Sequence, residues 1–428
     1  MLKKARLLLS DSLLRTSGLM FAAFMLASIF SYLFQIVMGR LLGPGQYGLL
    51  NALLSLMTVL SVPVGTLLMV VTRKAAGYKA KGNYGGAKGL FEQVNKAVLA
   101  AGGLGLAVFL ACSFLIRDYL NAPSLLPVAL LGLAAFASLP GPVNTAMLQG
   151  LQEYRWLAIS MALTGPARLA FTSLPVLAGF GVGGAVGGVI ATGVFVWGVT
   201  YFPLKGLLVS AGESSADRHL QFSRVIPVFI ANLAFAVMTQ ADMLLVNRYF
   251  QAQEAGVYAS AAILGRAVMY IPGSIVLAMF PMVSETKALN ASGGHLLIKS
   301  LLGTMVFSGG GALLFYFFPA WTMGTFFGAG YRGAAPLLKY FGLAMLPMAF
   351  LLVFMNYFVA REKTVFAYIM AVCAVLEITA MHFFHAVPLD IIKAMFAAGV
   401  LALAGGAAAQ LLPLTTSVRT KVGSGGNP

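Results

Sequence analysis

The chain has 428 residues, of which 60% are hydrophobic and only 9% are charged, and its formal net charge is +16. This composition excludes a water-soluble globular protein, because a soluble surface needs many more charged side chains. The two cysteines, Cys112 and Cys373, lie within apolar segments and form neither a disulfide framework nor a metal-ligand spacing.

Apolar segments follow one another along almost the whole chain, and each is long enough to cross a bilayer as a helix. In chain order they cover residues 16–40, 46–72, 92–116, 124–149, 156–179, 181–204, 222–247, 255–284, 296–318, 334–360, 364–385 and 388–412. The connectors between them are too short to form a soluble domain. We therefore predict an all-α integral membrane protein with about twelve transmembrane helices.

The basic residues are distributed unevenly between the two sides of this predicted arrangement. With the N-terminus placed in the cytoplasm, the cytoplasmic loops and ends hold roughly three times as many lysines and arginines as the outer side. This bias predicts that both termini are cytoplasmic. It also attributes the positive charge to topology and to anionic membrane lipids, so we expect no nucleic-acid partner.

One stretch of sequence occurs twice, with a shift of 208 residues. Residues 39–51 align with residues 247–259, which places Arg40 on Arg248 and Gly48 on Gly256. Duplicated membrane units are common in secondary transporters, and two six-helix copies enter the membrane in the same orientation. We predict two six-helix lobes related by a pseudo-two-fold axis along the membrane normal. The repeated arginines are expected to anchor their helices at the outer membrane surface.

The predicted domain organisation places the boundary between the lobes at a basic connector with Gly and Ser residues. We expect an N-terminal lobe at residues 1–208 and a cytoplasmic connector at residues 209–221. A C-terminal lobe at residues 222–412 and a cytoplasmic tail at residues 413–428 follow.

Four ionisable residues lie inside the predicted spans: Arg168, Asp242, Arg266 and Glu377. A charge at the centre of a bilayer costs roughly 2.5–3.5 kcal/mol even on insertion scales, so such residues usually face a partner or a wet cavity. Arginine binds phosphate with two parallel hydrogen bonds and stays protonated, which predicts an anionic ligand for Arg168 and Arg266. Ion pairs within the membrane, Asp242 with Arg266 and Arg168 with Glu377, are the structural alternative. Asp242 and Glu377 are also candidates for ion coupling or gating.

Basic residues near the end of the second span, Arg73 and Lys74, are weaker candidates for recruiting anionic lipid headgroups. The chain has no phosphate-binding loop, no hydrolase nucleophile motif and no cluster of metal ligands. The sequence therefore predicts neither an enzyme nor a bound metal or cofactor.

Three segments in a fixed order resemble a known family: GRLLGPGQYGLLNALLSL at 39–56, LQGLQEYRWLA at 148–158 and AILGRAVMYIPGSIVLAMFP at 262–281. They are similar to the polysaccharide flippases of the multidrug/oligosaccharidyl-lipid/polysaccharide exporter superfamily. The resemblance implies two V-shaped six-helix bundles around a central cavity. It also implies translocation of an undecaprenyl-diphosphate-linked oligosaccharide from the inner to the outer leaflet of a bacterial plasma membrane. Membrane lipids and the polysaccharide polymerase machinery are then the expected partners, and the chain is expected to be a monomer.

Three alternatives remain open at this point. A cation-coupled multidrug exporter of the same superfamily would be expected to bury acidic residues in its N-terminal lobe, whereas Asp11, Glu92, Asp118 and Glu153 fall at helix ends here. A flippase of the lipid-linked peptidoglycan precursor usually has more than twelve helices. A membrane scaffold without transport would not need the buried arginines.

Overall fold

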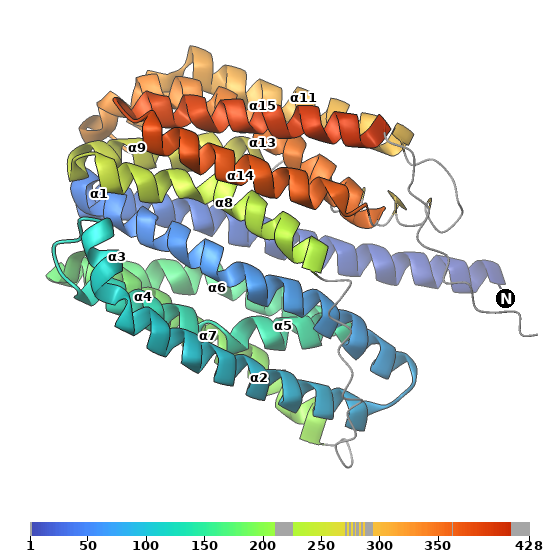
Figure 1. The fold of residues 1–428 in the computed structure, drawn as a ribbon. Coiled ribbons are helices and arrows are strands. Elements are labelled where there is room, and N and C mark those ends of the chain that lie inside the picture. The colour runs from blue at the N-terminus through green and yellow to red at the C-terminus, as the bar shows by residue number, and fades with distance from the viewer. Residues whose placement is uncertain are drawn as a thin grey trace, which may run out of the picture.

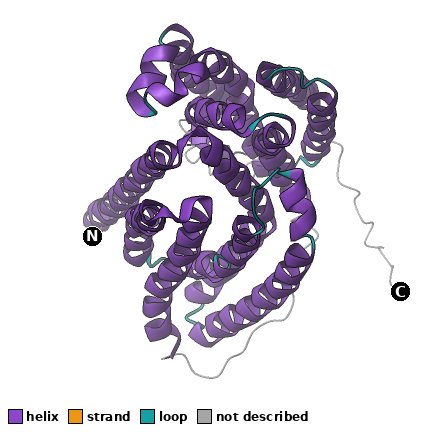
Figure 2. Ribbon diagram, turned by 90° about the vertical axis from the view of Figure 1, so that its left-hand side faces the viewer, coloured by secondary structure: helices purple, strands orange, loops and turns teal. Residues whose placement is uncertain are grey.

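A computed structural model describes residues 2–209, 226–269, 294–361 and 363–411, with scattered positions between 270 and 293. Within these residues every regular element is a helix (Figure 2). Only a helix or a closed barrel satisfies all backbone hydrogen-bonding groups inside a membrane, so long apolar segments of this kind become helices.

The helices of the N-terminal half are packed side by side in the lower part of Figure 1. They are α1 (Leu2–Ala80), α2 (Tyr84–Ala111), α3 (Ser113–Tyr119), α4 (Leu126–Ala137), α5 (Pro140–Gly150), α6 (Tyr154–Pro175), the π-helical turn η1 (Val176–Phe180) and α7 (Gly181–Val209).

The helices of the C-terminal half lie in the upper part of the same view (Figure 1). They are α8 (Ile226–Tyr249), α9 (Ala252–Gly265), the 3-10 helix η2 (Arg266–Met269), α11 (Gly294–Phe317), α12 (Pro319–Phe326), the 3-10 helix η3 (Ala329–Ala334), α13 (Ala335–Ala360), α14 (Val365–Phe383) and α15 (Pro388–Leu411).

Two of the long helical stretches contain glycines that divide them into separate spans. Gly43, at φ 68°, bends α1 immediately before Pro44. Gly179 and Gly181, at φ 91° and 53°, separate α6 from α7. A positive φ is costly for residues with a Cβ, so glycine allows the chain to reverse direction at these points. Both breaks fall where the hydropathy pattern predicted the end of one span and the start of the next.

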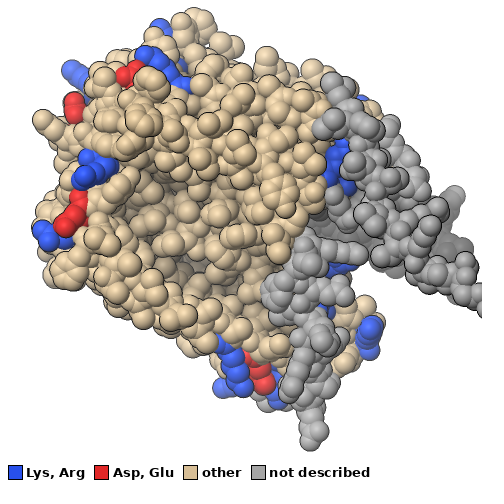
Figure 3. Space-filling view, in the orientation of Figure 1, with Lys and Arg blue, Asp and Glu red and all other residues tan. Residues whose placement is uncertain are grey.

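The predicted twelve-helix arrangement agrees with the structure. Nine stretches of the described residues are long and apolar enough to cross a membrane. Two of them contain a break, at Gly43 and at Gly179–Gly181, and therefore supply eleven spans. The remaining predicted span, 255–284, begins in α9 and continues only partly within the described residues. In Figure 3 the charged side chains lie toward the two ends of the visible face, and the surface between them is largely free of charge.

The order of helices is the same in both halves, as the repeated sequence predicted. Each half begins with a long helical segment that a second helical segment follows, and in each a short helix, α3 or α12, comes directly after the next long helix. Helix α1 packs on α6 within its own half and on α8 and α9 of the other half. This arrangement gives two lobes with α1 at their interface. The predicted connector, 209–221, lies outside the described residues except for Val209, and the predicted tail, 413–428, lies outside them entirely.

We name the two ends of the helix bundle after the glycines at their bends and turns. The Gly43 end contains the bend in α1 together with α3 and the start of α9 (Figure 1). The Gly82 end contains the turn between α1 and α2, where Gly82 has φ 64°.

The lobes meet closely at the Gly43 end through the two repeated glycines. A Cβ atom added to Gly48 would lie 2.8 Å from the backbone nitrogen of Gly256, and one added to Gly256 would lie 1.6 Å from the carbonyl oxygen of Pro44. Asn247 Nδ2 donates a 3.0 Å hydrogen bond to the Gly48 carbonyl beside this contact. Glycine is required here because the two backbones approach to a distance that leaves no room for a side chain.

The repeated arginines connect the lobes at the same end. Arg40 donates hydrogen bonds from Nε to the Phe326 carbonyl (3.0 Å) and from a terminal nitrogen to the Thr325 carbonyl (2.8 Å). Arg248 donates to the Asp118 carbonyl at 3.4 Å. Each acceptor lies in the last turn of the short helix of the opposite lobe, α12 or α3. We call these contacts the two latches. They go beyond the expected anchoring role, since both arginines contact the other lobe.

Two further hydrogen bonds follow the same pattern. Tyr331 donates from its hydroxyl to the Gly39 carbonyl at 2.6 Å. In the other direction, Asn121 Nδ2 donates to the carbonyls of Asn247 (3.1 Å) and Arg248 (3.0 Å). Gly39 and Asn247 are equivalent positions of the repeat, so each lobe holds the end of the other lobe's first helix.

Candidate functional site

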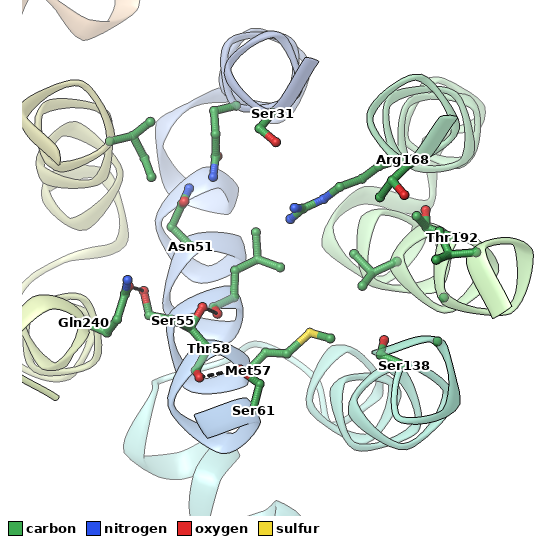
Figure 4. A pocket seen from close by; sticks show the side chains of 18 of the residues that line it. Ser31, Asn51, Ser55, Met57, Thr58, Ser61, Ser138, Arg168, Thr192 and Gln240 are labelled. Atoms are coloured by element: carbon green, nitrogen blue, oxygen red, sulfur yellow. Dashed lines mark hydrogen bonds between the residues drawn. The ribbon is translucent and has the colours of Figure 1, made fainter. Parts of the chain in front are cut away.

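A cavity of about 500 Å³ lies between the lobes and is lined mainly by the N-terminal lobe (Figure 4). Both halves of α1 contribute to its walls, together with the α4–α5 junction, α6 and α7. The C-terminal lobe adds Gln240 from α8, Ile263 from α9 and Arg266 at the start of η2. Ser55 Oγ donates a 2.9 Å hydrogen bond to Gln240 Oε1 and so joins the lobes at the cavity wall. A cavity at the interface between two structural units is a common location for a ligand site.

The cavity is unusually polar for a space inside a membrane protein. Eleven of its lining side chains carry a hydroxyl or amide group: Ser31, Tyr32, Gln35, Asn51, Ser55, Thr58, Ser61, Ser138, Thr164, Thr192 and Gln240. The only charged residues in the lining are Arg168 and Arg266, and no acidic residue of the described chain lines this space.

Several of these polar groups use their own helix as hydrogen-bond acceptor. Thr58, Thr164 and Thr192 each donate from the hydroxyl to the carbonyl four residues earlier. Asn51 donates from Nδ2 to the Tyr47 carbonyl in the same way. Their oxygens keep lone pairs that can accept hydrogen bonds from a ligand. The walls therefore suit a molecule rich in hydroxyl donors.

Arg168 supplies a positive charge to this space from α6. Its side chain points from α6 into the cavity, toward the α1 segment that carries Asn51 (Figure 4). The guanidinium carbon lies 4.1 Å from the centroid of the Phe34 ring, a cation–π distance that holds the group in place. The sequence placed Arg168 inside the membrane, and the structure places it in the wall of the polar cavity.

Arg266 also reaches the cavity, but its charge is compensated. It donates a 2.5 Å hydrogen bond to Asp242 Oδ1, and Tyr258 donates from its hydroxyl to Asp242 Oδ2 at 3.0 Å. Asp242 is fully buried, and Arg266 is 8% exposed. The pairing of Asp242 with Arg266 was the structural alternative suggested by the sequence. Arg266 therefore contacts a buried carboxylate, whereas the contact shown for Arg168 is the cation–π contact with Phe34.

Glu377 lies in α14 and does not line the cavity. It is 1% exposed, and neither of its carboxylate oxygens accepts a hydrogen bond from a described residue. The suggested contact between Arg168 and Glu377 is thus not a hydrogen bond in this structure. Burying a polar group without such a partner costs free energy.

The basic pair Arg73 and Lys74 lies near the Gly82 end of α1, outside the cavity lining, and Arg73 is exposed. Whether this pair recruits anionic lipid headgroups stays a prediction.

The polar residues of α1 were missed by reasoning that considered only charges. Asn51, Ser55 and Thr58 recur at intervals of four and three residues, which places them on one helix face. Polar residues with this helical periodicity inside an apolar span indicate a polar helix face, and this pattern could have identified them from the sequence.

The fold is shared with transporters of the MOP superfamily. An inward-facing structure of a multidrug resistance MATE family transporter covers 93% of this chain and 99% of its own, with a TM-score of 0.73 at 13% identity. An outward-facing structure of such a transporter has a TM-score of 0.63 at 14% identity, covering 92% and 96% of the two chains. The lipid II flippase MurJ, in an inward closed conformation, gives 0.64 at 13% identity and covers 91% and 88%. No curated protein sequence matches the chain.

The sequence model of the family described as "Polysaccharide biosynthesis protein" matches residues 13–287, well over half of the chain. The chain belongs to this polysaccharide biosynthesis family, which confirms the resemblance predicted from the three sequence segments. It is a multi-pass membrane protein with the fold of the MOP transporters.

Proposed function

We propose that this protein is a flippase for an anionic, lipid-linked oligosaccharide, with undecaprenyl diphosphate as the carrier. The observation that carries the proposal is the composition of the cavity, which combines hydroxyl and amide groups with Arg168 and lacks acidic residues in its described lining. An oligosaccharyl diphosphate offers the matching groups, since its sugars are rich in hydroxyls and its diphosphate is anionic. Family membership supports the same class of substrate.

In this proposal Arg168 binds the diphosphate with two parallel hydrogen bonds, for which the planar guanidinium is suited. Arg266 is a second binding residue whose charge becomes available when its contact with Asp242 loosens. Exchange of Arg266 between Asp242 and the substrate would connect occupancy of the cavity with a change between the lobes. Asp242 and Glu377 are the buried carboxyl groups proposed for coupling or gating.

The proposed cycle is alternating access. The Gly43 end is the outer end, as the distribution of basic residues predicted, and it is closed here by the latches and the Gly48–Gly256 contact. The higher TM-score to the inward-facing than to the outward-facing transporter supports this orientation. The lobes then separate at the Gly43 end and release the headgroup outside. A membrane potential that is negative inside favours this movement by about 2.3 kcal/mol per negative charge per 100 mV.

The proposed location is the bacterial plasma membrane, with both termini in the cytoplasm. Membrane lipids surround the lobes, the protein works as a monomer, and the polysaccharide polymerase machinery receives its product.

Transport in proteoliposomes tests the proposal. Purified protein is reconstituted, and translocation of an undecaprenyl-diphosphate-linked oligosaccharide is compared with uptake of a cationic dye, with protein-free liposomes as the control. We expect faster translocation of the lipid-linked oligosaccharide and no uptake of the dye. Uptake of the dye without movement of the lipid-linked oligosaccharide would instead identify a multidrug exporter.

A further inference from the structure

A second, apolar cavity of about 230 Å³ adjoins the polar one within the N-terminal lobe. It lies between the second half of α1 and the region where α4 meets α5. Its apolar walls are formed by Met57, Leu60, Val64, Gly65, Leu68, Ala135, Leu139 and Pro142. Four residues line both spaces: Met57, Ser61, Ser138 and Pro142.

The boundary between the cavities is a sharp change in polarity. The two hydroxyl groups there are satisfied by their own helices, since Ser61 donates to the Thr58 carbonyl at 2.7 Å and Ser138 donates to the Ala134 carbonyl at 2.6 Å. Beyond them, no described residue in the lining of the apolar cavity has a polar side chain. A cavity of this kind does not retain water well, and one of about 150 Å³ in another protein binds benzene. The space here is therefore large enough for one or two five-carbon units.

The position of the boundary relative to Arg168 determines which molecule could occupy both spaces. In Figure 4 the shared residues Met57, Ser61 and Ser138 lie together on one side of the polar cavity, while Arg168 enters from another helix. A single ligand filling both spaces needs an anionic, hydroxyl-rich part joined directly to an apolar chain. A polyprenyl diphosphate has this order of groups.

We propose that the apolar cavity binds the first isoprene units of the carrier lipid while its diphosphate is held at Arg168. This inference rests on the proposed function and adds a second contact for the substrate, in the N-terminal lobe between α1 and α5. The remainder of the polyprenyl chain then leaves the protein toward the bilayer beside Leu60, which is 43% exposed. The site would recognise the carrier lipid rather than the sugar.

Gly65 allows the apolar cavity to be filled without touching the polar one. Gly65 lines the apolar cavity and a Cβ atom added to it meets no atom within 4 Å, so Gly65→Phe is designed to occupy the space that the isoprene units would fill. Gly105→Phe is the matched control, because Gly105 is exposed on α2, lines neither cavity and also has nothing within 4 Å of an added Cβ. Leu60→Asn is a second variant, which makes the cavity polar instead of filling it.

The experiment measures binding of undecaprenyl diphosphate and of inorganic diphosphate to the purified full-length protein and its variants. We expect Gly65→Phe and Leu60→Asn to weaken undecaprenyl diphosphate binding by at least about tenfold, since apolar burial is lost, and to leave inorganic diphosphate binding unchanged. Gly105→Phe is expected to bind both as the wild type does.

Unchanged binding of undecaprenyl diphosphate by folded Gly65→Phe and Leu60→Asn, or equal weakening for both ligands, would overturn the inference. Selective loss of a cationic amphiphile in these variants would overturn it as well and assign the cavity to another class of ligand. If the wild type binds neither diphosphate, the proposed function itself fails, and this outcome is distinct from the others.

Discussion

Arg40 and Arg248 make equivalent contacts although they are 208 residues apart in the chain. Each lies near the end of the first helix of its lobe and donates to carbonyls in the last turn of the opposite lobe's short helix. A helix C-terminus has unpaired carbonyls and a partial negative charge, so arginine is a favourable partner. The distances differ, with 2.8 and 3.0 Å at Arg40 and 3.4 Å at Arg248, which makes the Arg40 latch the stronger one.

Removing the latches should shift the protein toward a form open at the Gly43 end. Each hydrogen bond of this kind contributes about 1 kcal/mol and Arg40 makes two, so Arg40→Ala should change the ratio of open to closed forms about 30-fold. Spin labels introduced at the exposed positions Ser124 and Gly330 lie on opposite lobes. Double electron–electron resonance would measure the longer distance between the two labels in the open form.

Arg332→Ala is the control for the latches, since Arg332 is exposed at the same end and contributes to neither of them. An unchanged distance distribution in Arg40→Ala, or an equal change in Arg332→Ala, would show that the latches do not hold the closed form.

The Gly48–Gly256 contact leads to a stronger prediction. Gly256→Val should prevent the Gly43 end from closing, because its Cβ would overlap the Pro44 carbonyl oxygen. Gly333→Ala at the same end is the control, as its nearest new contact would be an ordinary 3.8 Å. Cysteines introduced beside the contact should become reactive to a water-soluble thiol reagent in Gly256→Val only. Equal protection in both variants would contradict the assignment of this contact as the closed gate.

Breaking the Asp242–Arg266 pair by removing only one of its charges should destabilise the protein strongly. Arg266→Ala leaves the fully buried Asp242 carboxylate without its positive partner, a change that typically costs about 3–5 kcal/mol. The melting temperature in detergent should therefore fall clearly. Asp242→Asn with Arg266→Gln removes both charges and should recover most of the loss. A double variant as unstable as the single one would rule out charge pairing as the cause.

Glu377 offers a test of coupling that is separate from stability. Because its carboxylate accepts no hydrogen bond from a described residue, Glu377→Gln should fold with an unchanged or higher melting temperature. If Glu377 carries a proton in the cycle, Glu377→Gln should lose any stimulation of transport by a pH gradient and keep the response to membrane potential. A retained response to the pH gradient would exclude Glu377 as the carrier.

Much of the fold could be predicted from the sequence, because bilayer thickness and backbone hydrogen bonding restrict long apolar segments to helices. The bends at Gly43 and at Gly179–Gly181 coincide with breaks in hydropathy, and the repeat predicted the two lobes. The contacts of individual side chains were harder to predict from the sequence. Arg168 and Arg266 look alike in sequence, yet one lies over Phe34 in the cavity wall and the other is paired with Asp242. The partner of a buried charge depends on helix packing, which one sequence does not specify.

The proposed function depends above all on binding of the diphosphate by Arg168 during translocation. The most direct test is the initial rate of undecaprenyl-diphosphate-oligosaccharide flipping in proteoliposomes for the wild type, Arg168→Lys and Arg168→Ala at matched amounts of folded protein. Arg155→Ala, an exposed position on the same helix, is the control. Hydrogen bonds to charged groups contribute about 1.5–3 kcal/mol, so Arg168→Ala should lose about 10- to 100-fold in apparent affinity and, with substrate below saturation, a similar factor in the initial rate. Arg168→Lys should retain part of it, because the charge remains without the two-pronged geometry. Flipping at the wild-type rate by folded Arg168→Ala would show that Arg168 does not bind the diphosphate during translocation.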